Sequence, residues 1–145
     1  MKRFEFRLQP ALNHRQRLED QRRVELAELA SESFRVTTEI DRLESTLAQV
    51  LTQARHETRV DLDAAQRRAD YLVVLDLDLR YRRRELEDLE SAMELKRQEV
   101  LQASQDRRAL EKVREQRKDE HQKAVLREEQ RALDDLRVSP ANAPA

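Results

Sequence analysis

Three histidines, His14, His56 and His121, carry the side chains best suited to binding a metal or transferring protons. No two of them lie within one helical turn of each other, so their spacing does not predict a metal site. The adjacent carboxylates Asp134 and Asp135 are ordinary for such an acidic chain, and no predicted pocket surrounds them to shift their pKa values. The chain has no cysteine, which excludes disulfides and thiolate ligands. The sequence therefore predicts no catalytic residue, no metal and no cofactor, and we do not expect an enzyme.

The densest basic segment is residues 80–84, with the sequence Arg-Tyr-Arg-Arg-Arg. Such a segment can dock an acidic partner, an anionic lipid or a nucleic acid. Four acidic residues follow at once, Glu85, Glu87, Asp88 and Glu90, at spacings that form ion pairs on a helix. The whole chain balances 29 Lys and Arg against 30 Asp and Glu, which argues against a general nucleic-acid binder. A charge network within the helix is the favoured interpretation, and docking stays open as the alternative.

The elements that position these side chains must be built without glycine, which is absent, and with three prolines, Pro10, Pro140 and Pro144. Without glycine the chain cannot form a phosphate-cradling loop, and tight β-hairpins are disfavoured. Charged residues make up 41% of the chain and aromatic residues 3%, which is typical of long helices or of disorder. The longest uncharged apolar run, residues 71–75, is too short to cross a membrane. We therefore expect a soluble, cytosolic protein that could still associate with a membrane complex.

A heptad pattern favours ordered helix over disorder. Apolar side chains recur every seven residues in two rows, set three residues apart, as in the seam of a coiled coil. The rows of the first half are Leu26, Ser33, Ile40, Leu47 and Ala54, and Leu29, Val36, Leu43 and Val50. Those of the second half are Leu72, Leu79, Leu86, Met93 and Val100, and Leu75, Leu89, Ala103 and Leu110. The second row of this later half is interrupted by Arg82 and Lys96.

The two halves do not share one heptad frame, which predicts a turn between two helices, with a stutter in one long helix as the alternative. Polar residues must build this turn, and Asp61 and Asp63 can each cap the second helix. The predicted fold is all-α: a long antiparallel two-helix coiled-coil hairpin with an overhanging C-terminal helix. Its expected parts are an N-terminal segment 1–9, a first helix 10–57, a turn 58–63, a second helix 64–138 and a disordered tail 139–145.

Antiparallel pairing also predicts which residues face each other. Pairing Ala54 with Leu72 places Glu19 near Arg107 and leaves everything after about residue 125 without a partner in its own chain. That overhang keeps a helical stripe of apolar side chains: Leu126, Leu133 and Leu136. An apolar stripe without an internal partner suggests contact with another protein.

Two apolar features leave alternatives open. Phe4 and Phe6 could pack on the long helix near residues 114–118, or they could anchor a partner. Residues 71–75 are apolar on all sides of a helix, so only some of them can face the first helix. Extra packing near the turn and an exposed docking patch explain this run equally well.

Three segments carry a resemblance to a known family. The start of the chain, residues 1–12, contains the pattern Phe-x-Phe-x-Leu-x-Pro and resembles the opening of the flagellar export protein FliJ family. Residues 107–118 and residues 128–135 are similar to the C-terminal helix of that family. The resemblance covers essentially the whole chain. It implies an antiparallel two-helix coiled coil like the central stalk of rotary ATPases, and a soluble part of the flagellar type III export apparatus.

The resemblance also implies partners and a location. The expected partners are the flagellar export ATPase, the cytoplasmic domain of the export-gate membrane protein, and export chaperones, but no nucleic acid. The location implied is the cytoplasm, at the periphery of the inner membrane at the flagellar base. Residues implied to contact the ATPase are Phe4, Phe6, Leu8, Leu110, Arg114, Arg117, Leu126, Leu133 and Leu136. Residues implied to contact the gate are Leu43, Val50, Tyr71 and Leu75.

The sequence is also compatible with two rival functions. One is a structural scaffold that homodimerises through a continuous coiled-coil helix. The other is the equivalent stalk of a virulence type III secretion system, although the Phe-x-Phe start favours the flagellar version.

Overall fold

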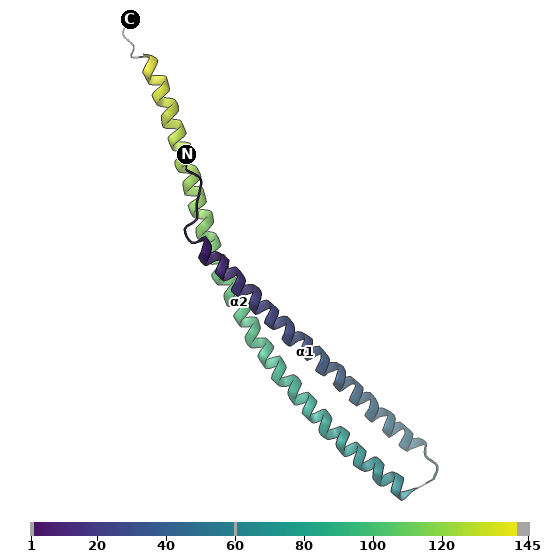
Figure 1. Cartoon of the computed structure of the whole chain (residues 1–145). Coiled ribbons are helices and arrows are strands. Elements are labelled where there is room, and N and C mark those ends of the chain that lie inside the picture. The colour runs from purple at the N-terminus through teal and green to yellow at the C-terminus, as the bar shows by residue number, and fades with distance from the viewer. Residues whose placement is uncertain (1, 60, 142–145) are drawn as a thin grey trace. The chain divides into compact units, whose positions relative to one another are not determined.

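The structure is a computed structural model that describes residues 2–59 and 61–141 of the chain. Two long helices, α1 (Gln9–His56) and α2 (Leu62–Ala141), account for nearly all of these residues. They pack antiparallel as a hairpin, and the described residues contain no strand (Figure 1). The predicted all-α coiled-coil hairpin is therefore confirmed.

One part of the fold prediction needs correction. No separate overhanging C-terminal helix is present in the described chain, because α2 runs unbroken from Leu62 to Ala141. The physical reason is that neither glycine nor proline occurs between Ala11 and Ser139 to interrupt it. The residues expected to overhang are the last turns of α2 itself. The remainder of the predicted tail, residues 142–145, lies outside the described residues.

A proline favours the start of α1 and an aspartate favours the start of α2. Pro10 lies in the first turn of α1, where a missing amide hydrogen leaves no hydrogen bond unmade. Asp61 caps α2, because its Oδ1 accepts hydrogen bonds from the backbone amides of Asp63 at 3.0 Å and Ala64 at 3.4 Å. This cap starts α2 at Leu62, ahead of the expected residue 64. The turn is built without a positive backbone φ at any described residue.

The described chain divides into two compact units. We call Gln21–Val100 the turn unit, because it contains the connection between the helices. We call the other the terminal unit: residues up to Asp20 together with those from Leu101 onward. Each unit holds antiparallel parts of both helices.

The turn unit has an apolar core at its centre. Val36, Ile40 and Leu43 of α1 are buried against Leu75 and Leu79 of α2. Half-buried leucines extend this core on both sides, namely Leu47, Leu72, Leu86 and Leu89. Every residue of the predicted heptad rows is buried or half-buried, so the sequence pattern located the seam correctly.

The terminal unit has fewer buried apolar residues and more polar ones. Leu12, Phe6 and Ala103 are buried in it, together with the polar side chains of Glu19 and Ser104. Glu19 is 1% exposed and its Oε2 accepts a hydrogen bond from Nε of Arg107, as the predicted register requires. Polar side chains thus occupy part of the seam in this unit.

Candidate partner-binding surfaces

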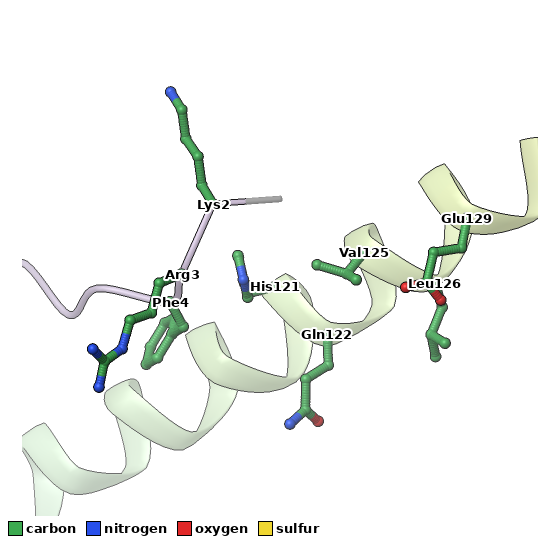
Figure 2. A pocket seen from close by; sticks show the side chains of 8 residues that line it. All are labelled: Lys2, Arg3, Phe4, His121, Gln122, Val125, Leu126 and Glu129. Atoms are coloured by element: carbon green, nitrogen blue, oxygen red, sulfur yellow. The ribbon is translucent and has the colours of Figure 1, made fainter. Parts of the chain in front are cut away.

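The N-terminal segment packs on α2 within the terminal unit. The ring of Phe6 is buried, and the guanidinium carbon of Arg117 lies 6.0 Å from its centroid, at the outer limit of a cation–π contact. The ring of Phe4 is half-buried, with its centroid 5.6 Å from that of His121 (Figure 2). Of the two alternatives for these rings, the structure shows packing on the long helix. Phe6 lies beside Arg117, which is within the expected residues 114–118. Phe4 lies beside His121, one turn beyond them.

Beyond this contact, α2 exposes a stripe of large apolar side chains. Every residue from 126 to 138 is exposed, and the leucines 126, 133 and 136 are each more than half exposed. At 3.6 residues per turn these three positions share one face of the helix. Soluble proteins rarely leave a contiguous apolar surface uncovered unless a partner binds it. We call Leu126, Leu133 and Leu136 the leucine stripe.

The other residues expected at the ATPase contact differ in accessibility. Leu8 and Arg114 are exposed, while Leu110 is half-buried in the seam between the helices. Phe6 is covered by its packing on α2, so little of its ring is accessible to a partner. Arg117 is exposed as well, so the accessible members of the predicted set are Leu8, Arg114, Arg117 and the leucine stripe.

A groove lies between the N-terminal segment and α2, with a volume of about 480 Å³. One wall comes from the N-terminal segment and the other from two turns of α2 (Figure 2). The residues that line it are Lys2, Arg3 and Phe4, and His121, Gln122, Val125, Leu126 and Glu129. Leu126 belongs to both the groove and the leucine stripe, so these two features form one continuous surface.

Ion pairs join the two helices in the seam of the terminal unit. Arg107 donates to Glu19 from Nε and to Glu111 from Nη1, the latter at 2.7 Å. The carboxylate of Glu19, followed by that of Glu111, raises the pKa of the Arg107 guanidinium above its ordinary value. Arg15 pairs with Asp106 at 3.4 Å. The two helices are thus tied by charge at positions where apolar side chains would be expected.

The residues expected at the export gate lie in the turn unit, and most of them face inward. Leu43 and Leu75 are part of the apolar core, and Val50 is half-buried in the seam. Tyr71 is 46% exposed and is the accessible member of the set. A partner that binds the folded turn unit can therefore reach Tyr71 but not the two core leucines.

Sequence reasoning left open whether the run at residues 71–75 forms an exposed docking patch, and the structure shows an exposed apolar surface beside Tyr71. Val73, Val74, Leu77 and Tyr81 are each at least 60% exposed. Val73 and Val74 are adjacent, and Leu77 and Tyr81 follow at steps of three and four residues, which places all four on the side of α2 opposite the core. We call these four residues the outer patch. Val73 and Val74 belong to the run at 71–75, which the sequence offered as a docking patch, whereas Leu77 and Tyr81 were not predicted as part of it.

The basic segment at residues 80–84 is largely paired. Arg80 pairs with Asp76, Arg82 with Glu85 and Arg83 with Glu44 of α1, each at 3.0 Å. The first two pairs lie within α2 and the third joins the two helices. This arrangement is the charge network that the sequence favoured, and it leaves Arg84 as the member without an ion pair to a described residue.

The described residues contain neither a membrane-spanning helix nor a cluster suited to a metal ion. None of their helices contains a stretch apolar enough to cross a membrane. Residues 2–59 and 61–141 contain no group of three His, Asp or Glu side chains that could hold a metal ion.

Comparison with known proteins assigns the chain to a family. The family model described as flagellar FliJ protein matches residues 4–142, which is nearly the whole chain. No curated protein and no solved structure is significantly similar to it. The match spans both helices and the packed N-terminal segment, the features that the resemblance of the sequence implied. The chain belongs to the flagellar FliJ protein family, whose members are non-enzymatic stalk proteins of the flagellar export apparatus.

Proposed function

We propose that this protein is a stalk that binds the flagellar export ATPase ring through its terminal unit and couples it to the export gate. The single observation that carries the proposal is the leucine stripe, three exposed leucines on one face of α2. Helices with an uncovered apolar face are typically recognised by a groove or helix of another protein. Family membership supplies the class of partner, which is a component of the export apparatus.

The second part of the proposal concerns the gate. We assign contact with the cytoplasmic domain of the export-gate membrane protein to the outer patch together with Tyr71. These side chains are accessible in the folded hairpin, whereas Leu43 and Leu75 stabilise it from within. Export chaperones are further partners of the proposed stalk. Its proposed location is the cytoplasmic face of the inner membrane, at the flagellar base.

Stimulation of ATP hydrolysis by the purified export ATPase of the same bacterium tests the ATPase contact. Removing the residues after about 125 should abolish stimulation, while circular dichroism still shows a helical hairpin because the core residues are untouched. A sharper variant replaces Leu133 and Leu136 with serine. Its matched control replaces Leu95 and Leu101, which are similarly exposed on α2 outside the stripe. Full stimulation by the stripe variant would refute the assignment.

Binding to the purified cytoplasmic domain of the gate protein tests the second contact. Replacing Val73 and Leu77 with aspartate should abolish this binding and leave stimulation of the ATPase intact, because both side chains point away from the core. Equal binding by wild type and variant would exclude the outer patch.

The rival scaffold function makes a different prediction about oligomeric state. A scaffold that dimerises through a continuous helix requires a stable parallel dimer with the two termini of one chain far apart. Light scattering that shows a monomer of the hairpin at micromolar concentration would exclude it. A virulence stalk would instead stimulate the ATPase of a virulence system and not the flagellar one.

A further inference from the structure

The groove between the N-terminal segment and α2 has an apolar interior. Phe4 and Val125 are half-buried along it, and Leu126 is 63% exposed at its edge (Figure 2). Concave apolar sites of this kind are where large side chains of a partner bind with most of the binding free energy. A volume of about 480 Å³ is ample for one such side chain.

The rim of the groove carries unpaired positive charge. Lys2 and Arg3 are exposed and form no ion pair with a residue in 2–59 or 61–141, and the side chain of Lys2 extends outward from α2 in Figure 2. The acidic lining residue, Glu129, lies at the other end of the groove. Elsewhere in the terminal unit the seam cations Arg15 and Arg107 are neutralised within the chain. The rim therefore favours a partner that brings carboxylates to the N-terminal end.

The groove is also continuous with the leucine stripe, because Leu126 belongs to both. A partner helix or loop that covers Leu133 and Leu136 can reach the groove without leaving α2. The two features then form one interface, with an apolar stripe along the helix and a recess at its inner end. Apolar contacts of this kind supply affinity, and the charged rim supplies orientation and a faster encounter.

We propose that this groove receives one large apolar side chain of the export ATPase, from a segment with carboxylates next to that side chain. The inference rests on the proposed function, since it names the part of the ATPase interface that the N-terminal segment forms. The carboxylates meet Lys2 and Arg3, and the apolar side chain lies between Phe4 and Leu126. This assigns a binding role to the packed N-terminal segment that is separate from its contact with α2.

Reversing the charge of Arg3 tests whether the rim of the groove binds carboxylates of the ATPase. Arg3→Glu should weaken binding to the purified ATPase about tenfold at low salt, and the difference should shrink at high salt because the charges are exposed. Arg7→Glu is the matched control, since Arg7 is exposed in the same segment but does not line the groove. Equal affinities of the two variants would overturn the role of the rim.

A photo-crosslinking amino acid in place of Leu126 tests whether a segment of the ATPase occupies the groove. The expected product joins this position to an ATPase peptide with an apolar residue beside Asp or Glu. A crosslink between two copies of this chain, or an ATPase peptide without carboxylates, would overturn the proposal. If the wild-type chain does not bind the ATPase at all, the proposed function fails as well. If Leu133 and Leu136 are needed for binding while both groove tests are negative, only the groove assignment fails.

Discussion

The turn unit and the terminal unit join the same two helices by different means. Five buried apolar side chains form the core of the turn unit. The terminal unit buries the apolar side chains of Phe6, Leu12 and Ala103, but it also buries the carboxylate of Glu19, which pairs with Arg107 in the seam. Apolar burial stabilises a helix pair in proportion to area, whereas removing charges from water offsets most of the attraction between them.

This difference suggests a division of roles within one hairpin. The apolar seam supplies stability near the turn, while the charged seam selects a register and contributes less to stability. A seam that is held by charge can also open at lower cost when a partner competes for its side chains. The accessible leucine stripe and the groove lie in the terminal unit, whose seam contains the ion pair of the buried Glu19 with Arg107 and fewer buried apolar side chains.

The largest expected effect concerns the apolar core of the turn unit. Leu79 is 2% exposed in the core, so Leu79→Ala removes buried contacts and leaves a cavity. We expect a loss of about 2–4 kcal/mol in the free energy of unfolding, measured with urea and circular dichroism. Leu95→Ala is the control, because that side chain is 63% exposed, and its loss should be about 0.5 kcal/mol or less. Similar losses for both variants would contradict the assignment of the core.

A smaller effect is expected from the buried ion pair. Glu19→Ala leaves the guanidinium of Arg107 without its partner across the seam, and we expect a loss of about 1–2 kcal/mol by the same measurement. The double variant Glu19→Leu with Arg107→Leu should be at least as stable as the wild type, because buried apolar pairs avoid the desolvation of charge. If the pair selects the register, spin labels near residues 12 and 114 should show a broader distance distribution in the double variant. An unchanged distribution would show that the pair has no such role.

The smallest effect concerns the ion pairs between helices in the turn unit. Glu25 accepts hydrogen bonds from Lys96 at 2.6 Å and from Arg22 at 3.1 Å, and these lower the pKa of its carboxyl group, the bond from Lys96 most. A carboxyl pKa that is lower in the folded state stabilises the fold above the ordinary glutamate pKa of about 4.3. That stabilisation is lost as the pH falls through the folded-state value.

We therefore expect the melting temperature to fall on acidification, and to fall less in Glu25→Gln than in the wild type. The difference should be small and should weaken in high salt, since these groups are only half-buried and remain in reach of solvent ions. Glu28→Gln, an exposed glutamate of the same helix without an ion pair to a described residue, is the control. An identical pH dependence for Glu25→Gln and the wild type would show that the pair contributes nothing.

Much of the fold was predictable because it depends on periodicity. The heptad rows placed the seam in both helices, and their antiparallel pairing placed Glu19 beside Arg107. The location of the sites was harder to predict. Leu43 and Leu75 were expected at the gate contact and are core residues, while the outer patch was predicted only in part, as one of two alternatives for the run at 71–75. An apolar residue looks the same in a sequence whether it faces a core or a partner.

The sequence by itself determined the helices, their pairing and the family, because these follow from residue spacing and from a start and C-terminal segments that resemble those of the family. Only the tertiary structure decided which apolar side chains remain accessible. A helix of the turn unit can bury one face against its neighbour, so Leu75 is covered and Val74 is not. The tertiary structure also placed Phe4 against His121, which forms the groove. That contact joins residues far apart in sequence, where no periodic pattern connects them.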